Sequence, residues 1–146
     1  MGKAALSKGD TDEALNQSNK ERRVNPNLAD AYLLAAEAYT RKQQYTLCAQ
    51  EYQKAIKLRP QGADIYVKLA KCYRLAGNLD VAEAMLNHAA AQESGYADIY
   101  KEQGEVYERK GDIERAIEAY SHYFVLNPNA PDRSQIEARL EGMGGR

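Results

Sequence analysis

Apolar and small side chains recur along this chain in a fixed register of 34 residues. The register is marked by ADAY at residues 29–32 and by ADIY at residues 63–66 and 97–100. Counted from each first Ala, positions 4 and 11 are tyrosine and position 8 is Ala or Gly, which places the three on one stripe of a helix. Positions 20 and 24 form a second stripe, a small residue followed by a large one. Such a period is typical of a repeat architecture.

Turn residues separate the two stripes of each unit. Gly-Asn at 77–78 and Gly-Asp at 111–112 combine a glycine, which can end a helix in the left-handed region, with a residue that can cap the next helix. Pro60 and Pro128 end the helix that carries the second stripe. Each unit is therefore predicted to be helix, tight turn, helix, break. In the unit from residue 29, Gln43 takes the place of the glycine, and a positive φ there would cost about 1 kcal/mol.

The tyrosines are placed by the repeat. Eight of the 11 fall on positions 4, 11 and 24, beside the small residues of positions 8 and 20. Small side chains let two helices approach, and the aromatic rings fill the space beside them. We therefore expect this stripe to be packed core and not a cofactor site.

This pattern of an aromatic at 4, small residues at 8 and 20, Tyr at 11, an aromatic at 24 and Pro at 32 resembles the tetratricopeptide repeat. The resemblance implies an all-α fold in which helix-turn-helix units stack into a short right-handed superhelical solenoid with a C-terminal capping helix. We expect a partial first repeat, with its first helix truncated, at 1–28. Complete repeats at 29–62, 63–96 and 97–130, a capping helix at 131–141 and a disordered tail at 142–146 should follow.

Both ends depart from the repeat pattern. The first unit begins near its seventh position, which favours a segment cut from a longer chain. Ser18 and Glu21 occupy packing positions of that unit, so we expect it to fray or to take cover from another molecule. At the other end Tyr123 replaces a small residue and would block a further standard repeat. Ile136 and Leu140, one turn apart, are therefore expected to lie on the capping helix.

Composition narrows the classes of partner. The formal net charge is -1 over 146 residues, so no global field attracts nucleic acid or an anionic membrane. No apolar run approaches the length of a membrane-spanning helix. Cys48 and Cys72 are too few for a disulfide scaffold, and both fall at positions expected to be core, so we predict two buried thiols. A reducing compartment fits them best, although buried thiols would also survive elsewhere, so the compartment stays unknown, with the cytoplasm as the default.

We find no catalytic constellation in the sequence. His88 and His122 both occupy position 26 and are one repeat apart, which is too far for two imidazoles to hold one metal ion. They are expected to lie on a solvated outer face. We find no zinc-type Cys/His spacing and no phosphate-binding Gly-rich loop before a helix. The sequence predicts no catalytic residue, no metal and no cofactor, and hence a protein that is not an enzyme.

The resemblance implies a concave groove lined by the first helix of each repeat. Carried over by register, the residues expected to bind a partner there are charged: Glu37, Arg41, Lys68, Lys71, Arg74, Lys101, Glu105 and Arg109. Lys68, Lys71, Arg74 and Lys101 are expected to hold acidic groups, although these charges would also suit a solvated face. The family's chaperone-tail clamp needs Lys and Asn at positions 5 and 9, and no Asn stands there, so that class of ligand is excluded.

The resemblance implies a non-catalytic scaffold or adaptor that binds a peptide or a partner helix in its concave groove, and an acidic peptide is one of the ligands we consider. Two alternatives stay open. The chain can be a self-assembly segment that forms a homodimer through the truncated first repeat, because an exposed apolar face seeks cover. It can also be the substrate-recruiting arm of a larger enzyme.

Overall fold

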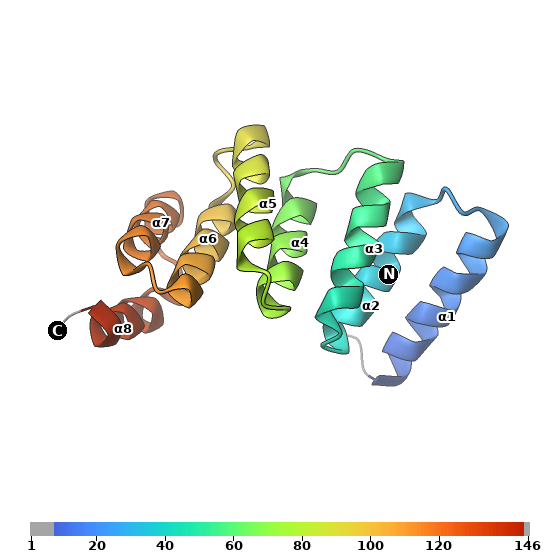
Figure 1. The fold of residues 1–146 in the computed structure, drawn as a ribbon, viewed down its shortest axis with the longest axis horizontal. Helices are drawn as coiled ribbons and strands as arrows, with labels where there is room; N and C mark the ends of the chain where they lie inside the picture. The colour runs from blue at the N-terminus through green and yellow to red at the C-terminus, as the bar shows by residue number, and fades with distance from the viewer. Residues whose placement is uncertain (1–7, 145–146) are drawn as a thin grey trace.

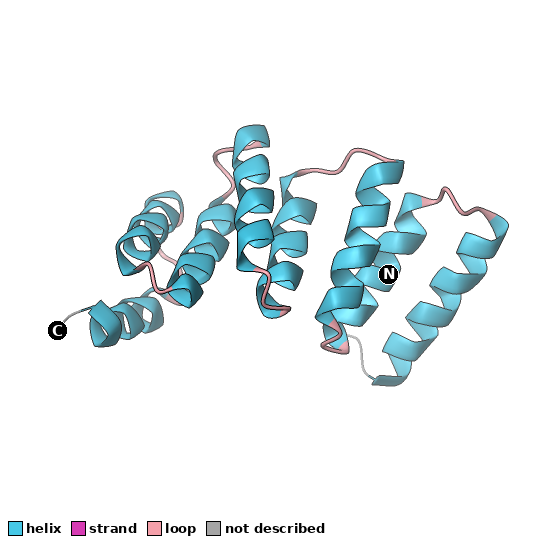
Figure 2. Ribbon diagram, in the orientation of Figure 1, coloured by secondary structure: helices cyan, strands magenta, loops and turns pink. Residues whose placement is uncertain are grey.

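The structure, a computed structural model, describes residues 8–144, and within them every regular element is an α-helix (Figure 2). The helices are α1 (Lys8–Val24), α2 (Ala29–Arg41), α3 (Tyr45–Leu58), α4 (Ala63–Leu75), α5 (Leu79–Gln92), α6 (Ala97–Lys110), α7 (Ile113–Leu126) and α8 (Arg133–Gly144).

The helices form antiparallel pairs that follow one another along an arch, from α1 at one end to α8 at the other (Figure 1). The pairs α2–α3, α4–α5 and α6–α7 correspond to the three units of the 34-residue register, and α1 is the second helix of the unit before them. The predicted all-α solenoid is confirmed. We refer to these units as repeats one to four, with α8 packed against repeat four.

The turns inside the repeats have the backbone geometry that the sequence predicts. Gly77 and Gly111 adopt positive φ, at 91° and 81°. Gln43 does the same at φ 61°, so the left-handed conformation is kept in the repeat that has no glycine there. Asp112 accepts a hydrogen bond from the Arg115 backbone N–H at 3.2 Å and caps α7, whereas Asn78 makes no such side-chain bond.

Small residues let the two helices of each repeat touch. Ala36, Ala70 and Gly104 at position 8 are buried, and so are the residues at position 20. The closest approach involves Gly104, where an added Cβ would lie 2.6 Å from the ring of Tyr120. That ring is 1% exposed, so the helix pair of repeat four closes only because position 104 lacks a side chain.

The position 4 tyrosines pack as part of the helix pair of each repeat. They also account for the positions of the two histidine rings. His88 and His122 are exposed, as expected, but each ring lies against the position 4 tyrosine of its own repeat. The ring centroids are 4.3 Å apart for Tyr66 and His88 and 3.8 Å apart for Tyr100 and His122. The histidines therefore extend the aromatic packing outward.

The two ends of the described chain differ from the expectations. In repeat one, Ser18 is fully buried and donates a hydrogen bond to the Ala31 carbonyl at 2.8 Å, so the polar residue at this packing position has its hydroxyl satisfied. At the other end α8 continues through Gly144, so residues 142–144 are helical and the prediction of a disordered tail from 142 is wrong for them. Residues 145–146 of that tail, and residues 1–7 of the truncated first helix, lie outside the described residues.

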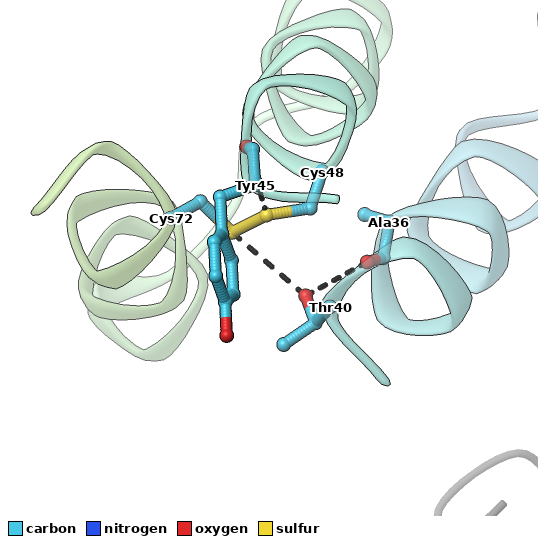
Figure 3. The surroundings of a disulfide bond; sticks show 5 residues. All are labelled: Ala36, Thr40, Tyr45, Cys48 and Cys72. Carbon is cyan, nitrogen blue, oxygen red and sulfur yellow. Dashed lines mark hydrogen bonds between the residues drawn. A yellow bond between two sulfur atoms is a disulfide. The ribbon is translucent and has the colours of Figure 1, made fainter. Parts of the chain in front are cut away.

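The cysteines are buried as predicted, but they are not free thiols. Cys48 in the first turn of α3 and Cys72 on α4 form a disulfide, with Cα atoms 6.2 Å apart (Figure 3). The two residues occupy unrelated positions of their repeats, so the periodic pattern alone does not show that they meet. Only the stacking of repeat two on repeat three brings α3 against α4. The argument for a reducing compartment, which assumed thiols, therefore loses its basis.

Candidate functional site: the face of α2, α4 and α6

The predicted binding residues all lie on the first helices of repeats two to four, α2, α4 and α6. These helices are neighbours across the repeat boundaries. Two contacts made from position 12 show this. The Thr40 hydroxyl on α2 lies 3.8 Å from the Cys72 sulfur on α4. Arg74 on α4 forms an ion pair with Glu102 on α6. We call the face formed by α2, α4 and α6 the groove face.

Arg74 is not an exposed cation. Its guanidinium pairs with Glu102 and lies 3.8 Å from Glu105, and both Arg74 and Glu102 are more than nine-tenths buried. Burial works against the charge of Arg74, but the hydrogen bond and charge of Glu102 outweigh it and raise its pKa. Burial raises the pKa of Glu102 despite the opposing effect of Arg74. Arg74 therefore links α4 to α6 through an intramolecular ion pair.

Three more predicted binding residues have partners within the chain. Lys101 pairs with Asp132 in the segment before α8, at 2.7 Å, and that hydrogen bond raises its pKa. Glu37 and Arg41 pair with each other along α2 at 3.9 Å. These groups can meet a ligand only by sharing or leaving their present partner.

Glu105 is the second partner of Arg74. The last three of the eight, Lys68, Lys71 and Arg109, are exposed and have no ion pair with any residue in the described range 8–144. Lys68 and Lys71 lie one turn apart on α4, in the middle of the groove face. Nearby positions 5 of α2 and α4 carry Leu33 and Val67, both half-buried. The groove face thus offers two free cations beside partly covered apolar side chains.

Sequence reasoning missed charged groups that hold α8 to repeat four and others that hold neighbouring repeats together. Glu108 on α6 binds Arg139 of α8 at 2.7 Å, and Asp132 anchors Lys101. A signal for them exists, because several pairs join opposite charges close to 30 residues apart, slightly less than one repeat. Lys42 and Asp12 are an example, and so are Lys110 and Asp80.

We expect acid to detach α8 from repeat four. Burial raises the pKa values of Asp132 and Glu108, but their bonds to Lys101 and Arg139 dominate and hold both below the usual range. A carboxylate whose pKa is lower in the folded state stabilises the fold above its unfolded pKa, near 4, and loses that contribution as the pH falls through the folded value. The protection factors of the α8 amides, measured relative to the intrinsic exchange rate at each pH, should therefore fall below about pH 4, before those of α4 and α5.

The control for this acid effect is the exposed pair Arg133–Glu137, which also lies on α8. Glu137→Gln should leave the pH dependence unchanged. Asp132→Asn should flatten it and loosen α8 already at neutral pH. Equal acid sensitivity of α8 and α4 would contradict the expected order.

Within residues 8–144 no group of three or more His, Cys, Asp or Glu side chains is placed to hold a metal ion. In the same part of the chain no helix is long and apolar enough to cross a membrane.

Family models and solved structures agree with this architecture. Residues 36–77 match the family model described as TPR repeat, and residues 67–131 match the one described as Tetratricopeptide repeat. No curated protein sequence matches the chain. A crystal structure of MamA is similar, with 25% identity, a TM-score of 0.84, and coverage of 94% of this chain and 81% of that one.

Two other solved structures share the fold at lower identity. YrrB, described as a TPR protein with an unusual peptide-binding site, has 16% identity, a TM-score of 0.76, and coverage of 92% of this chain and 69% of that one. The first TPR of Spaghetti (RPAP3), bound to the HSP90 peptide SRMEEVD, has 20% identity, a TM-score of 0.71, and coverage of 78% and 90%. The periodic sequence, the stacked helix pairs and these matches together show that the chain belongs to the tetratricopeptide repeat family.

Proposed function

We propose that this chain is a non-catalytic protein–protein interaction module that binds a peptide or a partner helix along the groove face. One observation carries the proposal. Most predicted binding charges of this face are already paired within the chain, whereas Lys68 and Lys71 are exposed, adjacent and without an ion pair in the described residues. Two unpaired cations on one turn suit a carboxylate.

The ligand we propose is an extended acidic peptide. Three first helices stacked at roughly 10 Å each give a face of about 30 Å, which accommodates about eight or nine extended residues. A carboxylate would lie between Lys68 and Lys71, with apolar side chains near Leu33 and Val67. Arg109 would bind a second acidic group. Arg74 and Lys101 would act by positioning α6 and the segment before α8, and the affinity would be of micromolar order.

Two structural neighbours support a peptide ligand by analogy. YrrB is described as having a peptide-binding site, and the RPAP3 domain holds an acidic peptide. Their identities to this chain are 16% and 20%, so they support the fold and the type of ligand alone. The absence of Asn from positions 5 and 9 here still argues against that particular chaperone peptide as the ligand.

The test is a degenerate nonapeptide array with free and amidated C-termini, probed with the native chain and with Lys68→Glu/Lys71→Glu. We expect acidic peptides to be captured by the native chain and at least about tenfold less by the variant. Lys20→Glu/Lys57→Glu changes the net charge equally at exposed positions of α1 and α3 and should bind normally. Equal capture by all three proteins, or capture by none, would refute the groove proposal.

Self-assembly is the second candidate, and one observation favours it. A hollow of about 400 Å³ between α7 and α8 is lined partly by Ile117, Phe124, Val125 and Leu140, and Val125 is 74% exposed. This hollow lies at the C-terminal end, whereas the sequence pointed to the truncated first repeat, of which residues 1–7 lie outside the described part of the chain. A dimer that dissociates on Val125→Glu, observed by light scattering, would support it. A recruiting arm of a larger enzyme would use the groove face and give the same array result.

A further inference from the structure

Ion pairs cross two of the boundaries between repeats at equivalent positions. Between repeats one and two, Lys42 Nζ lies 2.9 Å from Asp12 Oδ1. Between repeats three and four, Lys110 Nζ lies 2.7 Å from Asp80 Oδ1. Each pair joins position 14 of one repeat to position 18 of the repeat before it. The repeats on either side of these boundaries are therefore held by charge as well as by apolar contact.

The boundary between repeats two and three, which we call the middle seam, lacks this pair. Ala76 stands at position 14 and Thr46 at position 18. In the described structure no ion pair joins α2 or α3 to α4 or α5. A hollow of about 510 Å³ opens there instead, lined partly by Thr46, Ala76 and Tyr73. Two side-chain hydrogen bonds span the seam: Gln53 Nε2 donates to the Tyr73 hydroxyl at 2.9 Å, and the Thr40 hydroxyl lies 3.8 Å from the Cys72 sulfur.

The disulfide lies at this same seam. Cys48 on α3 and Cys72 on α4 are 0% and 1% exposed, and Thr40 of α2 contacts Cys72 at 3.8 Å, so three helices meet around the sulfurs (Figure 3). Cys72 directly follows Lys71, and Thr40 directly precedes Arg41. Any movement of α4 relative to α2 at this point changes the distance between charged residues of the groove face.

We propose that the Cys48–Cys72 disulfide is a redox-controlled clasp that holds repeats two and three, and with them the α2 and α4 parts of the groove face, in a fixed relative position. The regulatory part of this inference rests on the proposed function, because the regulated site is the groove face. At the middle seam the covalent bond takes the place of the ion pairs found at the other two boundaries. Reduction leaves two thiols that need van der Waals separation inside a filled core, so α3 and α4 must shift apart.

The chemistry is thiol–disulfide exchange with a dithiol. One thiolate of the dithiol attacks one cysteine sulfur, and the other cysteine leaves as a thiolate that takes up a proton. The second thiol of the dithiol then attacks the mixed disulfide. It releases the remaining cysteine as a thiol and closes the dithiol into its own disulfide. Two electrons and two protons pass to the protein. Because both sulfurs are buried, the attack requires a transient opening of the middle seam, which should make reduction slow in the native state.

The test is amide hydrogen exchange of the full chain, oxidised and after reduction with dithiothreitol. We expect the amides of α3 and α4 near the disulfide to exchange at least about tenfold faster after reduction, and those of α6 and α7 to be unchanged, because a linear repeat array can open locally. Equal exchange rates in the two states, or two free thiols in the protein purified under air, would overturn the proposal.

Two variants keep the result interpretable. Cys48→Ala/Cys72→Ala should exchange like the reduced protein and should not respond to dithiothreitol. Thr46→Asp/Ala76→Lys places the missing ion pair at the middle seam and should reduce the effect of dithiothreitol. If it does not, and the alanine variant is as protected as the oxidised protein, the disulfide is not the clasp.

Capture of acidic peptides on the nonapeptide array, measured with the oxidised and with the reduced protein, separates this inference from the proposed function. Weaker capture after reduction, together with faster exchange, supports regulation of the groove face. Absence of capture in both redox states counts against the proposed function and against the regulatory part, while the exchange data still decide whether the clasp exists. Equal capture in both states refutes regulation even if exchange accelerates.

Discussion

Arg74→Met is expected to lower the free energy of unfolding by about 3–5 kcal/mol, because it leaves a buried carboxylate without its partner. Glu102 is 8% exposed, and Glu105 lies one turn further along α6, so two carboxylates would face each other without the guanidinium between them. Guanidinium chloride unfolding monitored by circular dichroism measures the loss. A change under about 1 kcal/mol would show that the pair contributes little.

The pH dependence of this variant has a definite sign. Burial already raises the pKa of Glu102, and Arg74 is the group that opposes this rise. Without Arg74 the folded pKa moves further above the unfolded value, so the penalty is small below the unfolded pKa and grows as the pH rises toward the folded one. The deficit of Arg74→Met should therefore be smaller at pH 5 than at pH 7.

The double variant Arg74→Met/Glu102→Met is the matched control. Replacing both members of a buried ion pair with apolar side chains of similar size is often neutral or stabilising. We expect it to be closer to the native protein in stability than the single variant. A double variant as unstable as Arg74→Met would show that the lost packing, and not the unpaired carboxylate, causes the effect.

Tyr120→Ala is expected to lower the free energy of unfolding by a similar amount, about 3–5 kcal/mol. The ring is 1% exposed and fills the space left open at Gly104 on α6. Its hydroxyl donates a hydrogen bond to Glu108 at 2.7 Å and accepts one from Arg139 at 3.2 Å. One side chain on α7 therefore contacts α6 and α8, and its removal opens a cavity and frees the capping helix.

Tyr120→Phe separates the two contributions. It keeps the ring and removes only the hydroxyl, while Arg139 remains bound to Glu108, so the expected loss is about 1 kcal/mol. Amide exchange of α8 should rise in Tyr120→Phe and rise much more in Tyr120→Ala. If the two variants are equally unstable, the hydroxyl contacts and not the ring packing hold repeat four together.

The register was enough to place most of the groove-face residues on their helices. It could not show which of them are exposed to a ligand and which are paired with another residue of the chain. The sequence placed Lys68, Lys71 and Arg74 on one helix and assigned all three to a partner. The structure leaves the two lysines exposed and gives Arg74 to Glu102. The difference arises because position 12 points across the boundary to the next first helix, and the partner found there depends on how that repeat is stacked.

The repeat pattern by itself determined the helices, the turns and the solenoid, because each depends on contacts within one or two repeats. The positive φ of Gln43 is predictable for that reason: the turn geometry is set by its place in the repeat. The tertiary structure alone decided which residues meet across the boundaries. Cys48 and Cys72 are 24 residues apart, at positions with no periodic relation, and they pair only because stacking brings the start of α3 against α4. A period fixes which residues are equivalent, but the offset and rotation between neighbouring repeats fix which residues touch.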